Sequence, residues 1–378
     1  MKIGLVAGEA SGDLLGAGLI RALRMRHPDA SFEGVAGPAM VEAGCAQWEP
    51  AESLAVMGLI EPLRHIPRLL RLRRDLVRRW TASPPDVFIG IDAPDFNLGL
   101  EIRLRRSGIR TAHYVSPSIW AWRAGRAKKV KKAADRVLCI LPFEPKIYEK
   151  HGVDAVFVGH PKADEAPEVV DTAAARASLG LGAQEVVAVM PGSRSGEVAR
   201  LGGVFAAAAD RIAASRPDVH FVTPIAAPGL RQIFDEYLEQ QGVRDRFTLV
   251  DGSAQAAMSA ADVVLQASGT AVLEAALLRK PAVAAYRVAP LSYFLARYVF
   301  RLKLAHYTLP NLLTQEPLVP EFMQRDAQAG PIADAVIALL GDPRRRALIS
   351  ERFDRLRREL ALDADQRAAD AVLRLARP

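Results

Sequence analysis

Cysteine is scarce in this chain of 378 residues, which contains only Cys45 and Cys139. Two thiols in apolar surroundings do not build a disulfide framework, and a reducing compartment fits them better. The apolar start at residues 3–8 is interrupted by Glu9 and Asp13, too early for the core of a secretory signal peptide. No apolar run approaches the roughly 18–20 residues that a membrane span needs. Any contact with a membrane is therefore expected to be peripheral.

The motifs of several binding classes are also missing. No G-x-x-x-x-G-K-[ST] string occurs, which disfavours an NTPase, and no G-x-G-x-x-G follows the first predicted strand. The seven histidines are scattered without the spacing of metal ligands. The one D-x-D string, Asp363-Ala364-Asp365, falls in a charged helical stretch, where a solvated helix face explains it. Helix-turn-helix, RRM and zinc motifs are absent. We expect no metal, no cofactor and no nucleic-acid partner.

The residues that are present have an ordinary globular composition, with 50% hydrophobic and 25% charged residues. The net charge of +7 indicates an anionic partner without choosing among nucleic acid, membrane lipid and phosphorylated metabolites. Short, near-continuous apolar runs alternate with helical stretches, which predicts α/β domains with doubly wound parallel sheets. The predicted strands are residues 2–7, 86–91, 111–115, 136–141, 155–158, 185–190, 220–224, 247–250, 263–266 and 282–286.

The length allows two domains of roughly 150–200 residues. A polar segment with two prolines at residues 159–168 reads as a linker. We therefore predict domains at 1–163 and 164–345, followed by a helical tail at 346–378. Two sheets of this kind form a cleft at their strand ends, where such sheets usually bind ligands.

Two turns in the second half suit a nucleotide diphosphate. After the strand at 185–190 come Gly192, Ser193 and Arg194, followed by a helix. Glycine lets the backbone approach a ligand, the helix start offers free N–H groups, and arginine is a forked cation. The alternative is a glycine-containing βα turn with a surface arginine.

The second turn follows the strand at 263–266 and contains Ser268, Gly269 and Thr270. Glu274 lies one helical turn further on the same face, where a carboxylate can accept hydrogen bonds from ribose hydroxyls. Ser268 or Thr270 as a simple helix cap is the alternative. Two such turns in one domain favour a nucleotide-diphosphate site.

Small and acidic residues follow two strands of the first half. The opening strand ends in a polar turn with Glu9, Ser11 and Gly12, which we expect to point into the cleft. A later strand ends at Asp92, with Asp95 and Asn97 beyond Pro94. An acid at a strand end is well placed to act as a general base toward a hydroxyl group. Capping of the next helix by Asp95 or Asn97 is the alternative for one of them.

An aromatic, proline-containing loop at 114–122 holds Ser116 and Trp120. Its tryptophans either wall a binding site or pack beneath it, and the sequence does not decide between the two.

Taken together, these segments resemble the lipid-A-disaccharide synthase family. The matching strings, spread in order over nearly the whole chain, are VAGEASGD (6–13), GIDAPDFN (90–97), YVSPSIWAWRAGR (114–126), LPFEP (141–145), VGHP (158–161), PGSRSGEV (191–198), ASGTAVLEAAL (267–277) and LPNLL (309–313).

The resemblance implies a GT-B fold, with two Rossmann-like domains around a cleft. It implies an inverting transfer of 2,3-diacylglucosamine from UDP-diacylglucosamine to diacylglucosamine 1-phosphate, and we expect this transfer to need no metal. By the family pattern Asp92 is the expected base, with Asp95 second. Arg194, Glu274 and Asn311 carry over as contacts to the donor nucleotide. Another GT-B enzyme acting on UDP-N-acetylglucosamine, such as the lipid-II transferase or the 2-epimerase, is the rival interpretation.

Acylated substrates require access to a bilayer, and residues 60–80 are the best candidate for contact with an anionic membrane surface. A basic amphipathic segment of this kind can lie in the interface. Pro62 and Pro67 predict an irregular first half, and an ordinary surface helix is the alternative. The expected contact residues are Leu63, Ile66, Leu69, Leu70 and Leu72, with Arg68 and Arg71. We thus expect a cytoplasmic protein on the inner face of the inner membrane of a Gram-negative bacterium, and a homodimer stays open.

Overall fold

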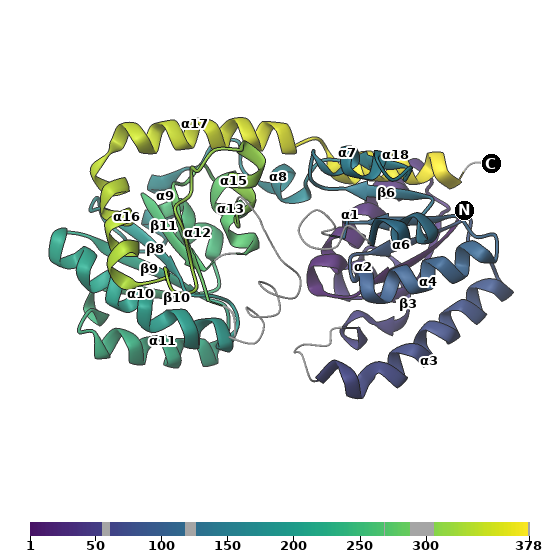
Figure 1. Ribbon diagram of the computed structural model, residues 1–378, viewed down its shortest axis with the longest axis horizontal. Helices are drawn as coiled ribbons and strands as arrows, with labels where there is room; N and C mark the ends of the chain where they lie inside the picture. The colour runs from purple at the N-terminus through teal and green to yellow at the C-terminus, as the bar shows by residue number, and fades with distance from the viewer. Residues whose placement is uncertain (55–60, 118–125, 268, 288–305, 377–378) are drawn as a thin grey trace. The chain divides into compact units, whose positions relative to one another are not determined.

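The computed structural model describes residues 1–54, 61–117, 126–267, 269–287 and 306–376, without the side chains of residues 61–65 and 270. The chain forms two compact units, drawn in Figure 1. Unit 1 comprises Met1–Asp164 and Leu360–Pro378, and unit 2 comprises Glu165–Glu359. Trp120 and Ser268 lie outside the described residues, as do the side chains of Leu63 and Thr270.

Unit 1 is built on a seven-stranded parallel sheet with the order β3-β2-β1-β4-β5-β6-β7. Its strands are β1 (Lys2–Ala7), β2 (Ser31–Ala36), β3 (Cys45–Pro50), β4 (Val87–Ile91), β5 (Thr111–Tyr114), β6 (Arg136–Cys139) and β7 (Ala155–Phe157). Its helices are α1 (Ala10–Arg26), α2 (Pro38–Glu42), the 3-10 turn η1 (Ala51–Ser53), α3 (Glu61–Ala82), α4 (Pro94–Arg106), α6 (Arg126–Ala133), α7 (Glu144–Glu149), α8 (Pro161–Glu165) and α18 (Ala364–Ala376).

Helices cover both faces of this sheet, which is why its strands are apolar on both sides. On β1, Leu5 belongs to the core cluster that includes α1 and α18. Val6 belongs to the opposite cluster, with Trp80 of α3 and Phe88. Helices α3, α4 and α6 pack side by side on that second face, α4 against both others. Both faces of the sheet are therefore covered, and its strand ends are left for other contacts.

Unit 2 repeats the plan with a six-stranded sheet of order β10-β9-β8-β11-β12-β13. Its strands are β8 (Val186–Met190), β9 (His220–Ile225), β10 (Phe247–Asp251), β11 (Val263–Ala267), β12 (Ala282–Tyr286) and β13 (Glu321–Met323). Its helices are α9 (Thr172–Ser178), α10 (Ser195–Ser215), α11 (Pro228–Gln240), the 3-10 turn η2 (Arg244–Arg246), α12 (Ala254–Ala260), α13 (Thr270–Leu277), α15 (Leu309–Thr314), α16 (Ala329–Gly341) and α17 (Pro343–Leu360).

In each sheet the strand order reverses direction once, between β1 and β4 in unit 1 and between β8 and β11 in unit 2. Neighbouring βα turns diverge at such a reversal, and open α/β sheets bind ligands there. The four turns singled out from the sequence follow β1, β4, β8 and β11. All four therefore flank a reversal point of their own sheet.

The C-terminal segment, expected as one helical tail, consists of two helices that join different units. Ile349 and Phe353 of α17 belong to the core of unit 2. Helix α18 packs against α1 in the core of unit 1. The carboxylate of Asp164 accepts hydrogen bonds from the backbone N–H groups of Asp363 (3.0 Å) and Ala364 (2.7 Å) and thereby caps α18.

All ten predicted strands are present, but β2, β3 and β13 were not predicted. Strand β2 contains Glu33, whose carboxylate accepts a hydrogen bond from the indole N–H of Trp80 and pairs with Lys2. Glutamate is disfavoured in strands, and these two tertiary contacts offset the unfavourable propensity. Strand β3 lies at the sheet edge with polar side chains, and β13 has only three residues.

The irregular start expected for residues 60–80 is wrong, because α3 is one helix with Pro67 inside it. Proline is tolerated in a first helical turn, where its missing N–H has no partner, so Pro62 fits the start of the helix. Packing of the helix onto the Trp80 cluster offsets the hydrogen bond that Pro67 omits.

Asp13 lies in the first turn of α1, shortly after β1, and is a structural residue. It is 5% exposed. Its carboxylate accepts hydrogen bonds from the backbone N–H groups of Gly37 (2.9 Å), Ala39 (2.9 Å) and Met40 (3.0 Å) at the start of α2. One side chain thus fixes α2 against α1.

We expect Asp13→Ala to lower the free energy of unfolding by about 2–3 kcal/mol, because it leaves buried donors without an acceptor. Chemical denaturation of the full chain measures this. Asp29→Ala is the control, since Asp29 is exposed and such changes usually stay within about 0.5 kcal/mol. Equal midpoints for the two variants would contradict the assigned role of Asp13.

Candidate active site

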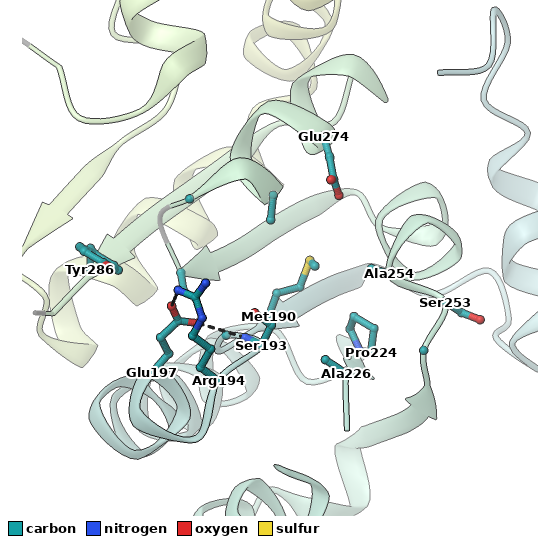
Figure 2. A pocket seen from close by; sticks show the side chains of 15 residues that line it. Met190, Ser193, Arg194, Glu197, Pro224, Ala226, Ser253, Ala254, Glu274 and Tyr286 are labelled. Carbon is teal, nitrogen blue, oxygen red and sulfur yellow. Dashed lines mark hydrogen bonds and ion pairs between the residues drawn. The ribbon is translucent and has the colours of Figure 1, made fainter. Parts of the chain in front are cut away.

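Unit 2 contains a pocket of about 600 Å³ at the carboxyl ends of β8 to β12, shown in Figure 2. Its size is in the range of small-molecule sites. The lining residues are Met190, Gly192, Ser193, Arg194, Glu197, Pro224, Ala226, Gly252, Ser253, Ala254, Ala267, Gly269, Ala271, Glu274 and Tyr286. Both turns predicted to hold a nucleotide diphosphate therefore line one cavity.

The turn after β8 runs directly into the N-terminus of α10. Gly192 has a φ of +132°, a conformation that favours glycine. Arg194 is the N-cap residue of α10, and its side chain is 66% exposed, so the guanidinium is available to a ligand. The free N–H groups and the positive dipole end of a helix N-terminus favour an anion at this position.

The turn after β11 lies across the pocket. Gly269 precedes the first residue of α13, and Glu274 stands one turn into that helix. Figure 2 shows Glu274 projecting from α13 on the side of the pocket opposite Arg194. The pocket thus has a cation and a helix N-terminus at one end and a carboxylate at the other.

Several lining residues were not found from the sequence. Glu197 sits one turn into α10, and its carboxylate accepts a hydrogen bond from the backbone N–H of Ser193 (3.1 Å). Gly252 and Ser253 follow β10, and Tyr286 ends β12. Of these residues, the Gly252-Ser253 pair could have been identified from the sequence, because a small turn directly after a strand resembles the two turns that were recognised. Only the sheet order brings these residues together.

Asn311 is not among the lining residues of the pocket. It is 1% exposed. Its amide donates to the carbonyl oxygen of Val319 (2.7 Å) and to Glu321 Oε1 (3.0 Å), and its carbonyl accepts from the N–H of Val319 (2.8 Å). In this structure Asn311 holds the segment before β13 in place.

In unit 1, Asp92 follows β4 in a strained turn. Asp92 and Ala93 have φ values of 51° and 42°, a left-handed pair without glycine. Such residues cost about 1–3 kcal/mol each and cluster at functional sites. The Asp92 N–H donates to the carbonyl oxygen of Tyr114 (2.8 Å). A Cβ on Gly8 would lie 2.6 Å from that of Ala93, so glycine is required where the turns after β1 and β4 meet.

A buried polar group supports this turn from below. Asn97 is completely buried, and its amide donates to the carbonyl oxygens of Val6 (3.3 Å), Ile91 (3.3 Å) and Asp92 (2.8 Å). One helical turn further, Glu101 pairs with Nδ1 of the buried His113 at 2.7 Å. Asn97 is therefore a positioning residue that joins the ends of β1 and β4, and neither a helix cap nor an exposed ligand contact.

The other predicted site residues of unit 1 differ in how far they are exposed to solvent. The side chain of Asp95 is 84% exposed and pairs with Arg126 at 2.6 Å. Glu9 and Ser11 are exposed at the start of α1, whereas Gly12 is buried there. The structure thus places exposed polar groups and Asp92 at the strand ends that flank one reversal point.

Ser116 and the two cysteines lie in the interior. The Ser116 hydroxyl is 2.9 Å from the Tyr148 hydroxyl, and burial raises the pKa of Tyr148. Burial also raises the pKa of Cys45 to about 12 and raises the pKa of Cys139. Both thiols are therefore protonated at neutral pH, which argues against a nucleophilic role.

Helix α3 presents Ile66 and Leu70 to solvent, 42% and 47% exposed. Leu69 and Leu72 are half-buried and pack against the Trp80 cluster. Arg68 pairs with Glu49 at 3.2 Å, and Arg71 is exposed. Among the predicted contact residues, Ile66 and Leu70 thus face solvent, whereas Leu69 and Leu72 face the protein core.

The solvated helix face proposed for the D-x-D string is wrong at Asp365. Its carboxylate packs against α1, where only Gly18 leaves room for it. Asp363 precedes α18 with a φ of 55° and is held by Asp164. In the described ranges, no three His, Cys, Asp or Glu side chains gather as metal ligands would. Nor does any helix there have the length and apolar character needed to cross a bilayer.

Comparison with known proteins gives a consistent result. The family model described as lipid-A-disaccharide synthetase matches residues 3–374. A lipid-A-disaccharide synthase of Alkalilimnicola ehrlichii is 52% identical over 99% of this chain and 98% of its own length. Among solved structures, the UDP-GlcNAc 2-epimerase from Neisseria meningitidis bound to UDP-GlcNAc has a TM-score of 0.63 at 12% identity, covering 99% of this chain and 100% of that one. The glycotransferase of kitacinnamycin has a TM-score of 0.61 at 17% identity, covering 99% and 98%. The two solved structures share the GT-B fold with this chain.

Proposed function

The chain belongs to the lipid-A-disaccharide synthase family, and from this premise we propose how its two units divide the reaction. The enzyme is an inverting glycosyltransferase. It transfers 2,3-diacylglucosamine from UDP-2,3-diacylglucosamine to 2,3-diacylglucosamine 1-phosphate, giving the β-1,6-linked disaccharide 1-phosphate and UDP. The epimerase shares only the fold at low identity, so its likeness does not favour the rival interpretation.

The observation that carries the assignment of the donor site is the pocket at the reversal point of unit 2. We assign the uridine diphosphate to this pocket. Arg194 and the N-terminus of α10 hold the diphosphate, because both favour a multivalent anion. Glu274 accepts hydrogen bonds from the ribose hydroxyls. Asn311 acts through the segment that it holds before β13.

Unit 1 binds the acceptor and supplies the base. The acceptor 6-hydroxyl oxygen attacks the anomeric carbon of the donor, and its proton passes to the carboxylate of Asp92. The bond from that carbon to the diphosphate oxygen breaks, and UDP leaves with the electron pair. Asp92 suits this role because the turn is rigid and Asn97 fixes its backbone.

Negative charge builds on the departing UDP and must be stabilised. Arg194 and the N-terminus of α10 supply positive potential at the pocket, which provides this stabilisation without a divalent ion. Removing one such group typically costs on the order of 10²–10³ in rate.

We also propose that α3 meets an anionic membrane surface, on the inner face of the inner membrane. The exposed Ile66 and Leu70 would enter the interface while neighbouring arginines contact headgroups. Each arginine near such a surface contributes about 1 kcal/mol.

Incubation of the purified chain with UDP-diacylglucosamine and diacylglucosamine 1-phosphate should yield the disaccharide 1-phosphate and UDP in equal amounts, detected by mass spectrometry. Excess chelator should leave the rate unchanged if the positive groups of the protein alone stabilise UDP. Loss of turnover in chelator would refute metal independence, and turnover of UDP-N-acetylglucosamine in place of the acylated donor would support the rival.

Asp92→Asn should lower kcat by about 10²–10⁴, the range for loss of a general base. Asp95→Asn should have a smaller effect, since Asp95 is exposed and paired with Arg126. Matching thermal unfolding curves for the two variants serve as the control. Near-normal turnover of Asp92→Asn together with an inactive Asp95→Asn would reverse the assignment.

Replacing Ile66 and Leu70 by serine should reduce binding to anionic liposomes roughly tenfold or more, because two exposed apolar side chains are lost. The control replaces the exposed Met25 and Val41 of unit 1 by serine. Leu69 and Leu72 are unsuitable, because they also pack against the core. Equal sedimentation of the two double variants with liposomes would remove α3 from the contact.

A further inference from the structure

Glu197 occupies the part of the pocket that the donor diphosphate requires. Its side chain is 17% exposed, and one carboxylate oxygen accepts the hydrogen bond of the Ser193 N–H at 3.1 Å. The other oxygen is 3.7 Å from a guanidinium nitrogen of Arg194. Figure 2 shows the three residues together at the start of α10. The chain's own carboxylate therefore already uses the cation and one amide of the anion site.

Gly192 makes this arrangement possible. A Cβ at Gly192 would lie 2.5 Å from the Cβ of Glu197 and 2.7 Å from its carboxylate oxygen Oε2. No L side chain fits there, and the φ of +132° also favours glycine. The turn is thus shaped around the carboxylate of Glu197 as well as around any phosphate that would replace it.

We propose that Glu197 is an internal competitor of the diphosphate: it fills the anion site when the pocket is empty, leaves it when the UDP-sugar binds, and returns as UDP departs. The proposal rests on the assignment of the donor to this pocket. A phosphate and the carboxylate cannot share Arg194 and the Ser193 N–H without strong repulsion between like charges.

The relative strengths of the two interactions favour replacement of the Glu197 carboxylate by the diphosphate. The Arg194–Glu197 pair is long at 3.7 Å, and its arginine is mostly exposed, so it contributes little to stability. A diphosphate carries more charge and can accept two parallel hydrogen bonds from the guanidinium, which is a stronger interaction. The diphosphate therefore displaces the carboxylate. Because the carboxylate competes with donor and product alike, it lowers the affinity for both, and for UDP this promotes release.

Glu197→Gln tests the proposal by titration calorimetry with UDP and with uridine. The amide oxygen of glutamine can still accept the Ser193 N–H, so the turn is retained, but the competing charge is gone. We expect UDP to bind roughly two- to tenfold more tightly, the size of one partly exposed charge interaction. Uridine has no phosphate, and its affinity should not change.

The control is Glu236→Gln, which removes the same charge from an exposed position on α11 and should leave UDP affinity unchanged. Unchanged or weaker UDP binding by Glu197→Gln overturns the proposal, as does equal tightening for uridine, since the effect would then not arise at the diphosphate. Thermal unfolding verifies that the variant is folded. Failure of the unchanged protein to bind UDP would instead refute the donor site itself.

Discussion

The single reversal of strand order in each parallel sheet is the constraint on which both sites depend. Parallel strands need crossover connections, and the crossovers on the two sides of the reversal run to opposite faces of the sheet. The turns after the two central strands therefore diverge and leave open backbone where side chains and amides can meet a ligand. In unit 1 these are the turns after β1 and β4, and in unit 2 those after β8 and β11. A repeated topology thus gives each unit an open edge at its reversal point, and the polar residues at the two edges differ.

The short polar motifs combine structural and chemical roles, residue by residue. In the turn after β1, Asp13 fixes α2, whereas Glu9 and Ser11 remain exposed. After β4, the Asn97 amide donates hydrogen bonds to three backbone carbonyl oxygens, and Asp92 lies in a strained turn. After β8, Gly192 accommodates Glu197, and Arg194 stays available. Each of these turns therefore places an exposed or half-buried polar side chain next to a residue with a structural role.

In the pocket of unit 2, the positive charge of Arg194 lies next to the carboxylate of Glu197. A helix N-terminus with a nearby arginine attracts anions, and leaving it empty would favour adventitious binding. Glu197 supplies a weak intramolecular anion at this point. Under the proposal made above, the same positive groups can bind a diphosphate and still release it.

The sequence by itself determined the two α/β units, ten of their strands and the polar turns at the two reversal points, because parallel strands covered on both faces must be apolar and glycine-rich turns are local features. It also determined the family, since eight ordered motifs are specific together. It missed β2, in which Glu33 depends on Trp80 and Lys2. Only the tertiary structure decided which turns share a pocket, that Asn97, Asn311 and Ser116 are engaged internally, and that Glu197 contacts Ser193 and Arg194. The physical reason is that sheet order and hydrogen-bond partners join residues far apart in the chain, and no local pattern records which partner a polar side chain has found.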